Sequence, residues 1–500
     1  MEQYDVVILG AGLGGMLCAA LLSREGMRVA VIEQNKQVGG CLQTFSFDKK
    51  IFDSCVHYIG AMDEGQTQRR IFDLAGISDQ LNLRRLDEDC FDEMIFGAEP
   101  IAYPHAQGAQ HFVSALAPYF PKEQQALRQY VDLLQHVGNC FPLYNLRNGS
   151  PHEKEKVSSW SISQGFQQAG VSSPLQQVLC GNNLLYAGQK HRTPFYVHAL
   201  VMKSYIDSAY KCIGGSSQIA KALWQQIRHH GGTIFRNEQV VEIGMEHGRA
   251  AYAQTKSGQR FYGKNFIANI HPAQVLNMLQ APGIKPVYKN RVMQMPNSVS
   301  AFMLNIVFKP GTVKYRNHNI YWNKSNDPFD AVNAVRDGGI HNYALYLTED
   351  PQRPGYAESA AILTYMDAAA TQQWQQTHNR SAAPSERCTE YEDFKQTHAA
   401  TMVHLVGQRY PEISSNIHSF KVATPLTFRD YMGTVDGSMY GIMTDVSFPE
   451  ASRIPVKTKI PNLFFTGQNV NLHGVLGVSI TALATCGALV GLDYLLKKIP

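Results

Sequence analysis

The chain opens with Asp5-Val-Val-Ile-Leu9-Gly10-Ala-Gly12-Leu-Gly14-Gly15 and, after a small-residue segment, reaches Val29-Ala-Val-Ile32-Glu33. An apolar strand, a glycine-rich turn, a helix and a second strand ending on an acid, in this order, are typical of a βαβ dinucleotide-binding unit. A glycine turn with only a structural role would not require the second strand or the acid. The stretch therefore predicts a Rossmann-like nucleotide-binding domain at the start of the chain.

Each part of this unit has a physical role. Gly10 permits the tight turn out of the strand, Gly12 lets the backbone approach a pyrophosphate, and Gly15 lets the helix pack closely on the strand, with Gly14 in the same turn. The N–H groups of the helix that starts here point at the phosphates. The Glu33 carboxylate is placed to accept hydrogen bonds from the adenosine ribose hydroxyls.

A glycine pair follows closely, in Gln34-Asn-Lys-Gln-Val-Gly39-Gly40-Cys-Leu-Gln-Thr-Phe. Paired glycines let the chain pass close under a cofactor, which extends the site from the adenosine end toward the ring end. The alternative is an ordinary Gly-Gly turn. Its position directly behind the ribose-binding acid favours FAD over a nicotinamide cofactor.

Composition excludes several classes of function. The 500 residues correspond to two to four domains, with 44% hydrophobic and 17% charged residues, which suits a large buried interior. A net charge of +4, without a basic stripe among aromatic residues, does not indicate nucleic-acid binding. Nine cysteines without a C-x-x-C pair predict reduced thiols and no metal site.

We expect a cytoplasmic protein, since the first strand begins too early to leave room for a signal peptide. The apolar segment Val475–Leu496 is interrupted by polar residues and predicts a buried helix rather than a membrane span. Its basic end, Lys497-Lys498, is a candidate for peripheral contact with a membrane surface.

Further along the chain, Glu123–Val137 is apolar at helical spacing. A glycine turn and an amphipathic helix follow Ile213, with strands over 230–243 and 263–269. Pro461–Gln468 predicts a buried strand that leads into a glycine turn and the final helix. Cofactor-like signals at the start, the middle and the end predict a discontinuous nucleotide domain with two insertions.

Several stretches together resemble one enzyme family. They sample the entire chain in the family's order: Gly39–Phe45, Phe52–Gly60, Tyr210–Ser216, Ala423–Gly433, Met439–Gly441 and Thr466–Ser479. They resemble retinol saturases (all-trans-retinol reductases) and, more distantly, carotenoid isomerases and phytoene desaturases. All of these are FAD-dependent proteins of the amine-oxidase superfamily that act on long conjugated polyenes.

The resemblance implies further cofactor-binding residues. Val240 falls where the family contacts adenine through a strand. Gly467 and Gln468 fall where the chain reaches the ribityl and the pyrophosphate, and Gly477 and Val478 fall where the last helix points its N–H groups at the flavin ring. Many relatives carry an acid in place of Gln468, but an amide also hydrogen bonds to a ribityl hydroxyl or a phosphate.

The expected fold class is therefore α/β: a discontinuous Rossmann-like FAD-binding domain of the GR2 type with an inserted α+β substrate domain. We expect the FAD-binding domain to comprise residues 1–85, 205–290 and 441–500. The substrate-binding domain would then comprise residues 86–204 and 291–440.

Saturation of an unactivated C=C bond needs a hydride from the flavin and a proton for the second carbon, so histidines and tyrosines near the ring are candidates. We select His57 and Tyr58 after the glycine pair, His198 and Tyr205 on an apolar helical segment, and His473 beside the final helix. For each histidine the alternative is a structural hydrogen bond.

Two thiols, Cys41 and Cys55, lie close to the cofactor-binding stretches in sequence. Since no sequence feature activates either one, we expect structural thiols at both positions.

The favoured function is an FAD-dependent oxidoreductase that saturates a C=C bond of a lipophilic polyene. Desaturation or cis–trans isomerisation on the same scaffold is the alternative, and an amine oxidase is a third possibility. A lipid-binding escort of the Rab GDP-dissociation-inhibitor type is the non-enzymatic alternative. Because the chain has one dinucleotide fingerprint, a reductase of this kind needs an external electron donor.

Overall fold

The N-terminal βαβ unit forms as the sequence predicts. In the computed structural model, which describes residues 3–279, 284–379 and 387–500, strand β1 (Gln3–Leu9) is buried from Val6 onward. Helix α1 (Leu13–Arg24) begins directly after Gly12, and β2 (Val29–Glu33) returns parallel to β1. Fully buried, mostly β-branched residues suit the centre of a parallel sheet with helices on both faces.

The first sheet has seven strands collected from three parts of the chain. Strands β10, β2, β1, β13 and β19 are mutually parallel, and β12 and β11 continue beyond β13 as antiparallel strands. The later strands are β10 (Thr233–Arg236), β11 (Val240–Glu246), β12 (Arg249–Thr255), β13 (Arg260–Ala268) and β19 (Leu463–Phe465).

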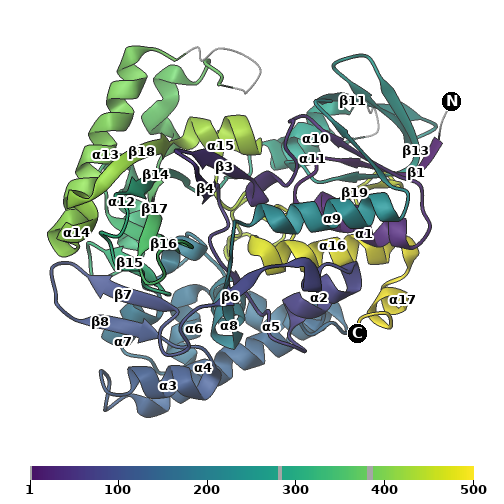
Figure 1. Ribbon diagram of the computed structural model, residues 1–500. Coiled ribbons are helices and arrows are strands. Elements are labelled where there is room, and N and C mark those ends of the chain that lie inside the picture. The colour runs from purple at the N-terminus through teal and green to yellow at the C-terminus, as the bar shows by residue number, and fades with distance from the viewer. Residues whose placement is uncertain (1–2, 280–283, 380–386) are drawn as a thin grey trace.

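Helices cover both faces of this sheet (Figure 1). On one face α1 packs against α9 (Ser217–His229) and against α16 (Gly474–Val490), with α2 (Thr67–Ala75) beside α16. On the other face lie α10 (Pro272–Met278) and α11 (Pro286–Met293). The apolar faces of these helices bury both faces of the sheet.

The last apolar segment forms a buried helix, as expected. Helix α16 ends at Gly491, whose φ of +96° breaks the helix, and α17 (Leu492–Leu496) follows. Among the residues that the structure describes, no helix is both long enough and apolar enough to cross a membrane.

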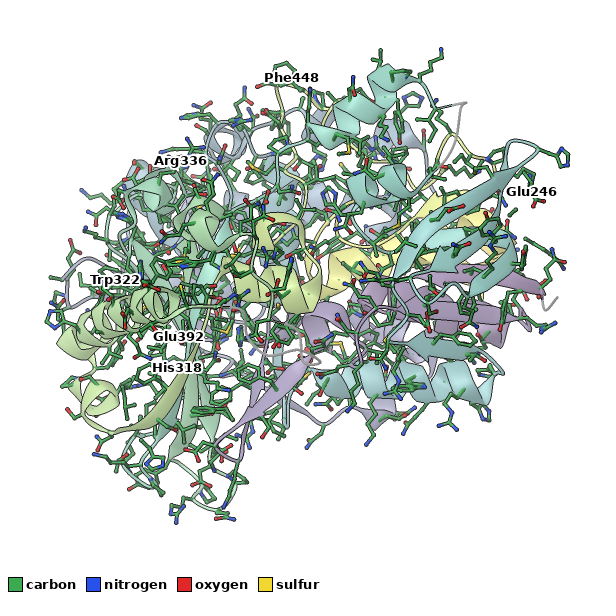
Figure 2. All side chains as sticks on the ribbon, turned by 90° about the horizontal axis from the view of Figure 1, so that it is seen from above. Glu246, His318, Trp322, Arg336, Glu392 and Phe448 are labelled. Atoms are coloured by element: carbon green, nitrogen blue, oxygen red, sulfur yellow. The ribbon has the colours of Figure 1, made fainter. Side chains whose placement is uncertain are left out.

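The second sheet lies at the other end of the molecule; Figure 2 shows Trp322 of this sheet opposite Glu246 of the first. Its seven strands run in the order β18-β14-β17-β16-β15-β7-β8, antiparallel except for the pair β15 and β7. They are β7 (Asp92–Phe96), β8 (Ala102–His105), β14 (Ser300–Phe308), β15 (Asn319–Asn323), β16 (Asn342–Glu349), β17 (Ala357–Met366) and β18 (Ile417–Ala423).

Helices also cover the second sheet. Helix α13 (Thr389–Arg409) packs on one face of it, followed by α14 (Pro411–Ser415) (Figure 1). A helical layer between 109 and 207 supports the other face and shares one core with it. The longer members of this layer are α3 (Ala109–Leu116), α4 (Gln124–Asn139), α6 (Ile162–Gln168), α7 (Ser173–Leu179) and α8 (Phe195–Asp207).

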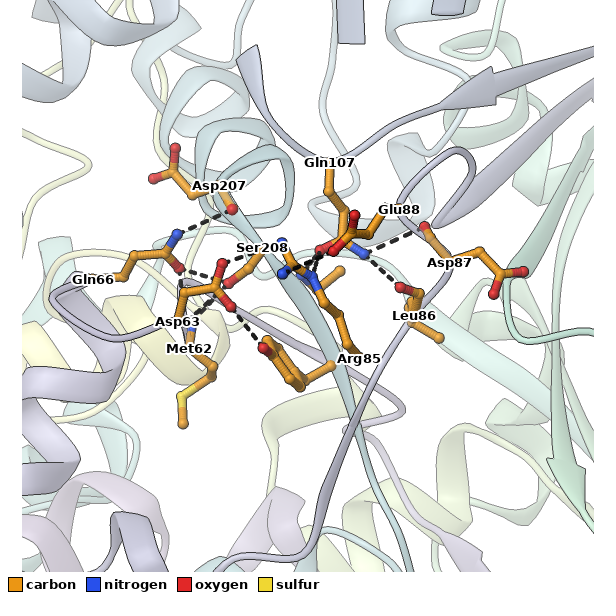
Figure 3. A network of polar contacts seen from close by, with 12 residues as sticks. Met62, Asp63, Gln66, Arg85, Leu86, Asp87, Glu88, Gln107, Asp207 and Ser208 are labelled. Atoms are coloured by element: carbon orange, nitrogen blue, oxygen red, sulfur yellow. Dashed lines mark hydrogen bonds and ion pairs between the residues drawn. The ribbon is translucent and has the colours of Figure 1, made fainter. Parts of the chain in front are cut away.

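A small three-stranded sheet connects the two halves. It consists of β5 (Ile59–Gly60), β9 (Ala209–Cys212) and β6 (Leu83–Arg85) in that order. Polar side chains surround this sheet (Figure 3): the Ser208 hydroxyl, directly after α8, donates to Gln66 at 2.6 Å, and Arg85 of β6 donates to Gln107 at 3.0 Å. These bonds fix the segment in which the chain crosses between the sheets.

The α/β class with a Rossmann-like unit is thus confirmed. The division into two domains at the boundaries given above stays a prediction, which is supported by the fact that each large sheet takes its strands from one of the two proposed sets of segments.

Substitution of Asn462 tests whether the C-terminal part of the chain stabilises the first sheet. Its buried amide donates to the carbonyls of Ala250 (2.8 Å) and Lys264 (2.9 Å) and accepts from the N–H of Ala250 (2.9 Å). We expect Asn462→Ala to lower the free energy of unfolding in urea by about 3 kcal/mol, because it leaves buried backbone groups unpaired. The exposed Asn333→Ala is the control, and an equal effect of both variants would contradict this role.

Candidate functional site

The glycine-rich turn is the point where three segments of the chain meet. Gly10 has a φ of +95°, a conformation that favours glycine. The Gly39 N–H donates to the Ala11 carbonyl at 2.7 Å, and a Cβ atom on Gly40 would lie 3.1 Å from the Gly12 Cα. The glycine pair therefore brings the chain directly against the first turn.

The side chain of Asn269, just beyond β13, fills the centre of this junction. Its amide donates to the Gly10 carbonyl at 3.3 Å. Cβ atoms on Gly12, Gly14 and Gly467 would lie 2.9, 2.7 and 2.6 Å from its amide atoms. The glycines therefore make room for Asn269 as well as for a ligand.

Gly15 has a different role, since a Cβ atom there would lie 2.2 Å from the Gly10 carbonyl oxygen. This contact is the close approach of helix to strand that the sequence pattern predicts.

A cleft of about 720 Å³ opens at this junction and extends to residues 429–438. Its volume falls within the range of about 300–1,000 Å³ that small-molecule and cofactor sites occupy. Most of the predicted binding residues line it: Gly10, Gly12, Gly14, Glu33, Gly39, Gly40, Val240, Gly467, Gln468 and Val478.

Glu33 lies at the expected end of β2, buried in the wall of the cleft. One carboxylate oxygen accepts from the Ala11 N–H at 2.8 Å and the other from the Asn35 N–H at 2.9 Å. Burial raises the pKa of this carboxyl above its usual value. A carboxylate has about four lone-pair sites, so Glu33 keeps acceptor capacity for a ligand hydroxyl.

Two helices start at the cleft without a side-chain cap. Neither Gly12 before α1 nor His473 before α16 supplies a capping side chain. The first N–H groups of both helices therefore remain available for an anionic or electron-rich ligand.

Gly477 differs from its predicted position, because it does not line the cleft. A Cβ atom there would lie 2.6 Å from the Leu472 side chain, so this glycine lets the preceding loop fold back on the helix.

A second cavity of about 120 Å³ adjoins the cleft. Tyrosine, histidine, methionine and aliphatic side chains line most of it, and we call it the aromatic cavity. The residues that it shares with the cleft are Cys41, Val56, Met432, Thr434, Ser438, Gly474 and Val475.

His57 lines the aromatic cavity and stacks on Tyr346, with ring centroids 4.1 Å apart and an interplanar angle of 8°. Its Nε2 atom is buried without a hydrogen-bond partner. Burial, together with the nearby Lys211 ammonium, lowers the pKa of His57 to about 3. The ring is therefore neutral, with one nitrogen free to meet a ligand.

Tyr58 anchors a chain of buried hydroxyl groups. It donates to the Asp92 carboxylate at 2.7 Å and lies 2.8 Å from the Tyr321 hydroxyl, which in turn lies 3.1 Å from that of Tyr346. Asp92 also accepts from the amides of Asn182 and Asn319. Burial raises the pKa of Asp92 to about 6.

Tyr205 and His473 also line the aromatic cavity. The Tyr205 ring packs on Tyr58 with centroids 4.4 Å apart. The His473 Nε2 atom lies 3.1 Å from the Leu185 carbonyl, and burial lowers the pKa of this histidine to about 4.

His198, by contrast, lies outside the aromatic cavity. Its two ring nitrogens each lie 2.8 Å from a tyrosine hydroxyl, that of Tyr130 on one side and that of Tyr186 on the other. Burial lowers its pKa to about 3. The position supports the structural alternative for this residue.

Sequence reasoning missed Asp92, Tyr321 and Tyr346. Polar residues in otherwise apolar strands are the sequence signal that could have indicated them, but the three residues lie on three different strands. Only the parallel pairing of β7 with β15, and the antiparallel pairing of β15 with β16, brings them to Tyr58.

The sequence resemblance is confirmed by comparison with known proteins. A family model described as an NAD(P)-binding Rossmann-like domain matches residues 8–74. The all-trans-retinol 13,14-reductase of Rattus norvegicus is 27% identical over 99% of this chain and 86% of its own length. Prolycopene isomerase 1 of an Oncidium hybrid cultivar is 21% identical, over 88% and 76%. The 4,4′-diapophytoene desaturase of a Methylomonas species is 24% identical over 60% of each chain.

The fold is also shared with a solved putrescine oxidase variant redesigned for cofactor binding. It superposes with a TM-score of 0.63 at 14% identity, over 98% of this chain and 99% of the other. The chain thus carries a Rossmann-type nucleotide site inside an oxidase-like fold.

Stability measurements can distinguish His198, whose two ring nitrogens both have hydrogen-bond partners, from His57, whose Nε2 atom has none. We expect His198→Phe to lower the free energy of unfolding in urea by about 2 kcal/mol, because it removes two buried hydrogen bonds. His57→Phe removes a ring whose Nε2 atom has no partner, so its effect should be clearly smaller. A larger loss for His57→Phe would contradict the assignment of His198 as structural.

Proposed function

We propose that the protein is an FAD-dependent oxidoreductase that saturates a C=C bond of a lipophilic polyene. The main support is the direct connection between a nucleotide-binding cleft and a cavity lined by apolar and aromatic side chains. The relatives named for reactions on retinol and on carotenoids fit the same substrate class.

The residues of the cleft suit FAD. In this proposal Gly12 and Gly14 receive the pyrophosphate, Glu33 the adenosine ribose and Val240 the adenine, with Gly467 and Gln468 nearer the ribityl chain. The uncapped N-terminus of α16 would lie at the ring end, where it stabilises negative charge. When bound, FAD supplies hydride transfer to or from its ring.

In this proposal the aromatic cavity holds the reacting part of the polyene, since its volume of about 120 Å³ lies below the range of about 300–1,000 Å³ of complete small-molecule sites. Its wall is rich in side chains without charge, which suits a conjugated hydrocarbon. The apolar members of the wall are Val56, Leu185, Ala301, Met303, Leu363, Phe428, Met432, Met439 and Val475.

Tyr346 is the proposed proton donor for the second carbon. It ends the hydroxyl chain that starts at Asp92, and its ring lines the cavity. Tyr58 donates to the Asp92 carboxylate, and in this proposal protonation of Asp92 reverses that bond, so that a proton can pass through Tyr58 and Tyr321 to replace the one that Tyr346 gives up. Burial raises the pKa of Tyr346, which keeps its hydroxyl protonated and able to donate.

The resemblance leaves related reactions as alternatives. Desaturation would use the same cleft and cavity, since hydride transfer is reversible. Redox-neutral isomerisation is a further alternative on the same scaffold. An amine oxidase or a lipid-binding escort would not need a proton chain that ends in the cavity. The domain boundaries, a cytoplasmic location with peripheral membrane contact at the basic C-terminal end, and an external electron donor complete the proposal.

The cofactor assignment predicts a yellow protein with a flavin absorption spectrum. In Glu33→Ala the ribose hydroxyls lose their acceptor, so the affinity for FAD, measured by fluorescence titration of the apoprotein, should fall by at least about tenfold. Gln274→Ala, elsewhere on the cleft wall, is the matched control. A preparation that never binds flavin would favour the escort.

The reaction is tested by incubating dithionite-reduced protein with all-trans-retinol without oxygen. A gain of two hydrogens in the product mass supports saturation, whereas an unchanged mass with altered geometry indicates isomerisation. Loss of two hydrogens with the oxidised protein indicates desaturation.

The proton chain predicts a loss of turnover in Tyr346→Phe. The rate of saturation should fall by about 10²–10⁴-fold while the flavin spectrum stays unchanged, because only the proton donor is removed. Tyr365→Phe, a buried tyrosine outside the cavity lining, should retain activity. Equal rates for Tyr346→Phe and Tyr365→Phe would contradict this role of Tyr346.

The same proton chain predicts a pH dependence. Since Asp92 loses its proton as the pH rises through about 6, the wild-type rate of saturation should decline above that pH.

A further inference from the structure

Two cysteines lie together at the boundary between the cleft and the aromatic cavity. Cys41 follows the glycine pair, and Cys55 follows β4 (Lys50–Asp53), which pairs antiparallel with β3 (Thr44–Phe47). The Ser54 N–H donates to the Gln43 carbonyl at 3.0 Å and extends the pairing to this end of the hairpin. The hairpin register therefore brings the two thiols to the same place.

The two thiols lie close to each other, both at the aromatic cavity and one of them also at the cleft. They lie close enough for each to shift the pKa of the other, and neither forms a disulfide. Both line the aromatic cavity, and Cys41 also lines the cleft. Both side chains are half-buried rather than fully enclosed.

The surroundings of the two thiols shift their pKa values in opposite directions. The hydrogen bond from Cys55 lowers the pKa of the Cys41 thiol. Burial and the Asp53 carboxylate contribute to a raised pKa of Cys55, where that same hydrogen bond is the largest cause. Of the two thiols, Cys41 therefore loses its proton more readily, and it is the one that lines both cavities. A thiolate is the reactive form of cysteine.

A second thiol pair in the chain provides a contrast. Cys18 of α1 and Cys486 of α16 also share a hydrogen bond, but both are fully buried between the helices. Neither lines the cleft or the aromatic cavity. Contact between thiols alone would therefore not distinguish Cys41 and Cys55; their position at the boundary of the two cavities does.

We propose that Cys41 and Cys55 form a redox-active dithiol–disulfide couple that supplies electrons to the bound flavin. This inference rests on the proposed function and names the entry point of the reductant that the function requires. It replaces the sequence-based expectation of structural thiols at these positions.

The step is balanced in atoms and electrons. The two S–H bonds break and one S–S bond forms, so the thiols are oxidised by two electrons and release two protons. Those two electrons and two protons would be enough to reduce one bound FAD to FADH₂. An external dithiol then attacks the disulfide, is itself oxidised to a disulfide, and restores both thiols.

The first experiment determines which cysteines form a disulfide and needs no activity assay. The purified protein is oxidised with diamide, denatured, alkylated and digested, and its peptides are identified by mass. We expect one linked peptide pair joining Cys41 to Cys55, which dithiothreitol separates and which Cys41→Ser and Cys55→Ser abolish. Cys90→Ser, a half-buried cysteine outside both cavities, should leave it unchanged. Absence of the pair, or preferential linkage of Cys18 to Cys486, would overturn the proposal.

The second experiment follows the visible flavin absorbance under anaerobic dithiothreitol. The wild type and Cys90→Ser should bleach at the same rate, and Cys41→Ser and Cys55→Ser at least about tenfold more slowly. Dithionite should bleach all four, which shows that the serine variants still hold reducible flavin. Equal bleaching of all variants by dithiothreitol would overturn the electron transfer. A flavin-free protein that still forms the disulfide would instead refute the cofactor assignment.

Discussion

The structure depends on the contact of Asn269 with the glycine-rich turn. This one side chain occupies the space that Cβ atoms on Gly12, Gly14 and Gly467 would fill, and its amide is bonded to the Gly10 carbonyl. Three strands that are hundreds of residues apart in sequence can therefore end at the same point. Because they end there, the starts of α1 and α16 both face one cleft.

The arrangement of charge around the site follows from burial. The histidines His57 and His473 are neutral because each lies in an environment that disfavours its charged form. Asp92 is the buried acid of the network, and three hydrogen-bond donors satisfy it. A cavity with neutral walls and a proton source behind one wall suits chemistry on a hydrocarbon better than binding of a charged ligand.

The positions of the predicted residues show which parts of the site a sequence pattern can predict. Gly10 and Glu33 lie as expected because a βαβ unit is a local structure, fixed by residues close together in sequence. Gly477 and His198 lie elsewhere because their surroundings are set by segments distant in sequence, the loop at Leu472 and the helix that carries Tyr130. Spacing along a helix indicates which face a residue shares, but it does not indicate what packs on that face.

By itself, the sequence determined the nucleotide-binding unit, the α/β class and the resemblance to polyene-modifying enzymes. These follow from local strand and helix periodicity and from glycines whose role depends on immediate neighbours. Only the tertiary structure decided that Asp92 stands behind Tyr58, that Tyr346 ends the hydroxyl chain, and that Cys41 meets Cys55. Those contacts depend on strand pairing between distant segments, and their register is set by packing across the entire fold.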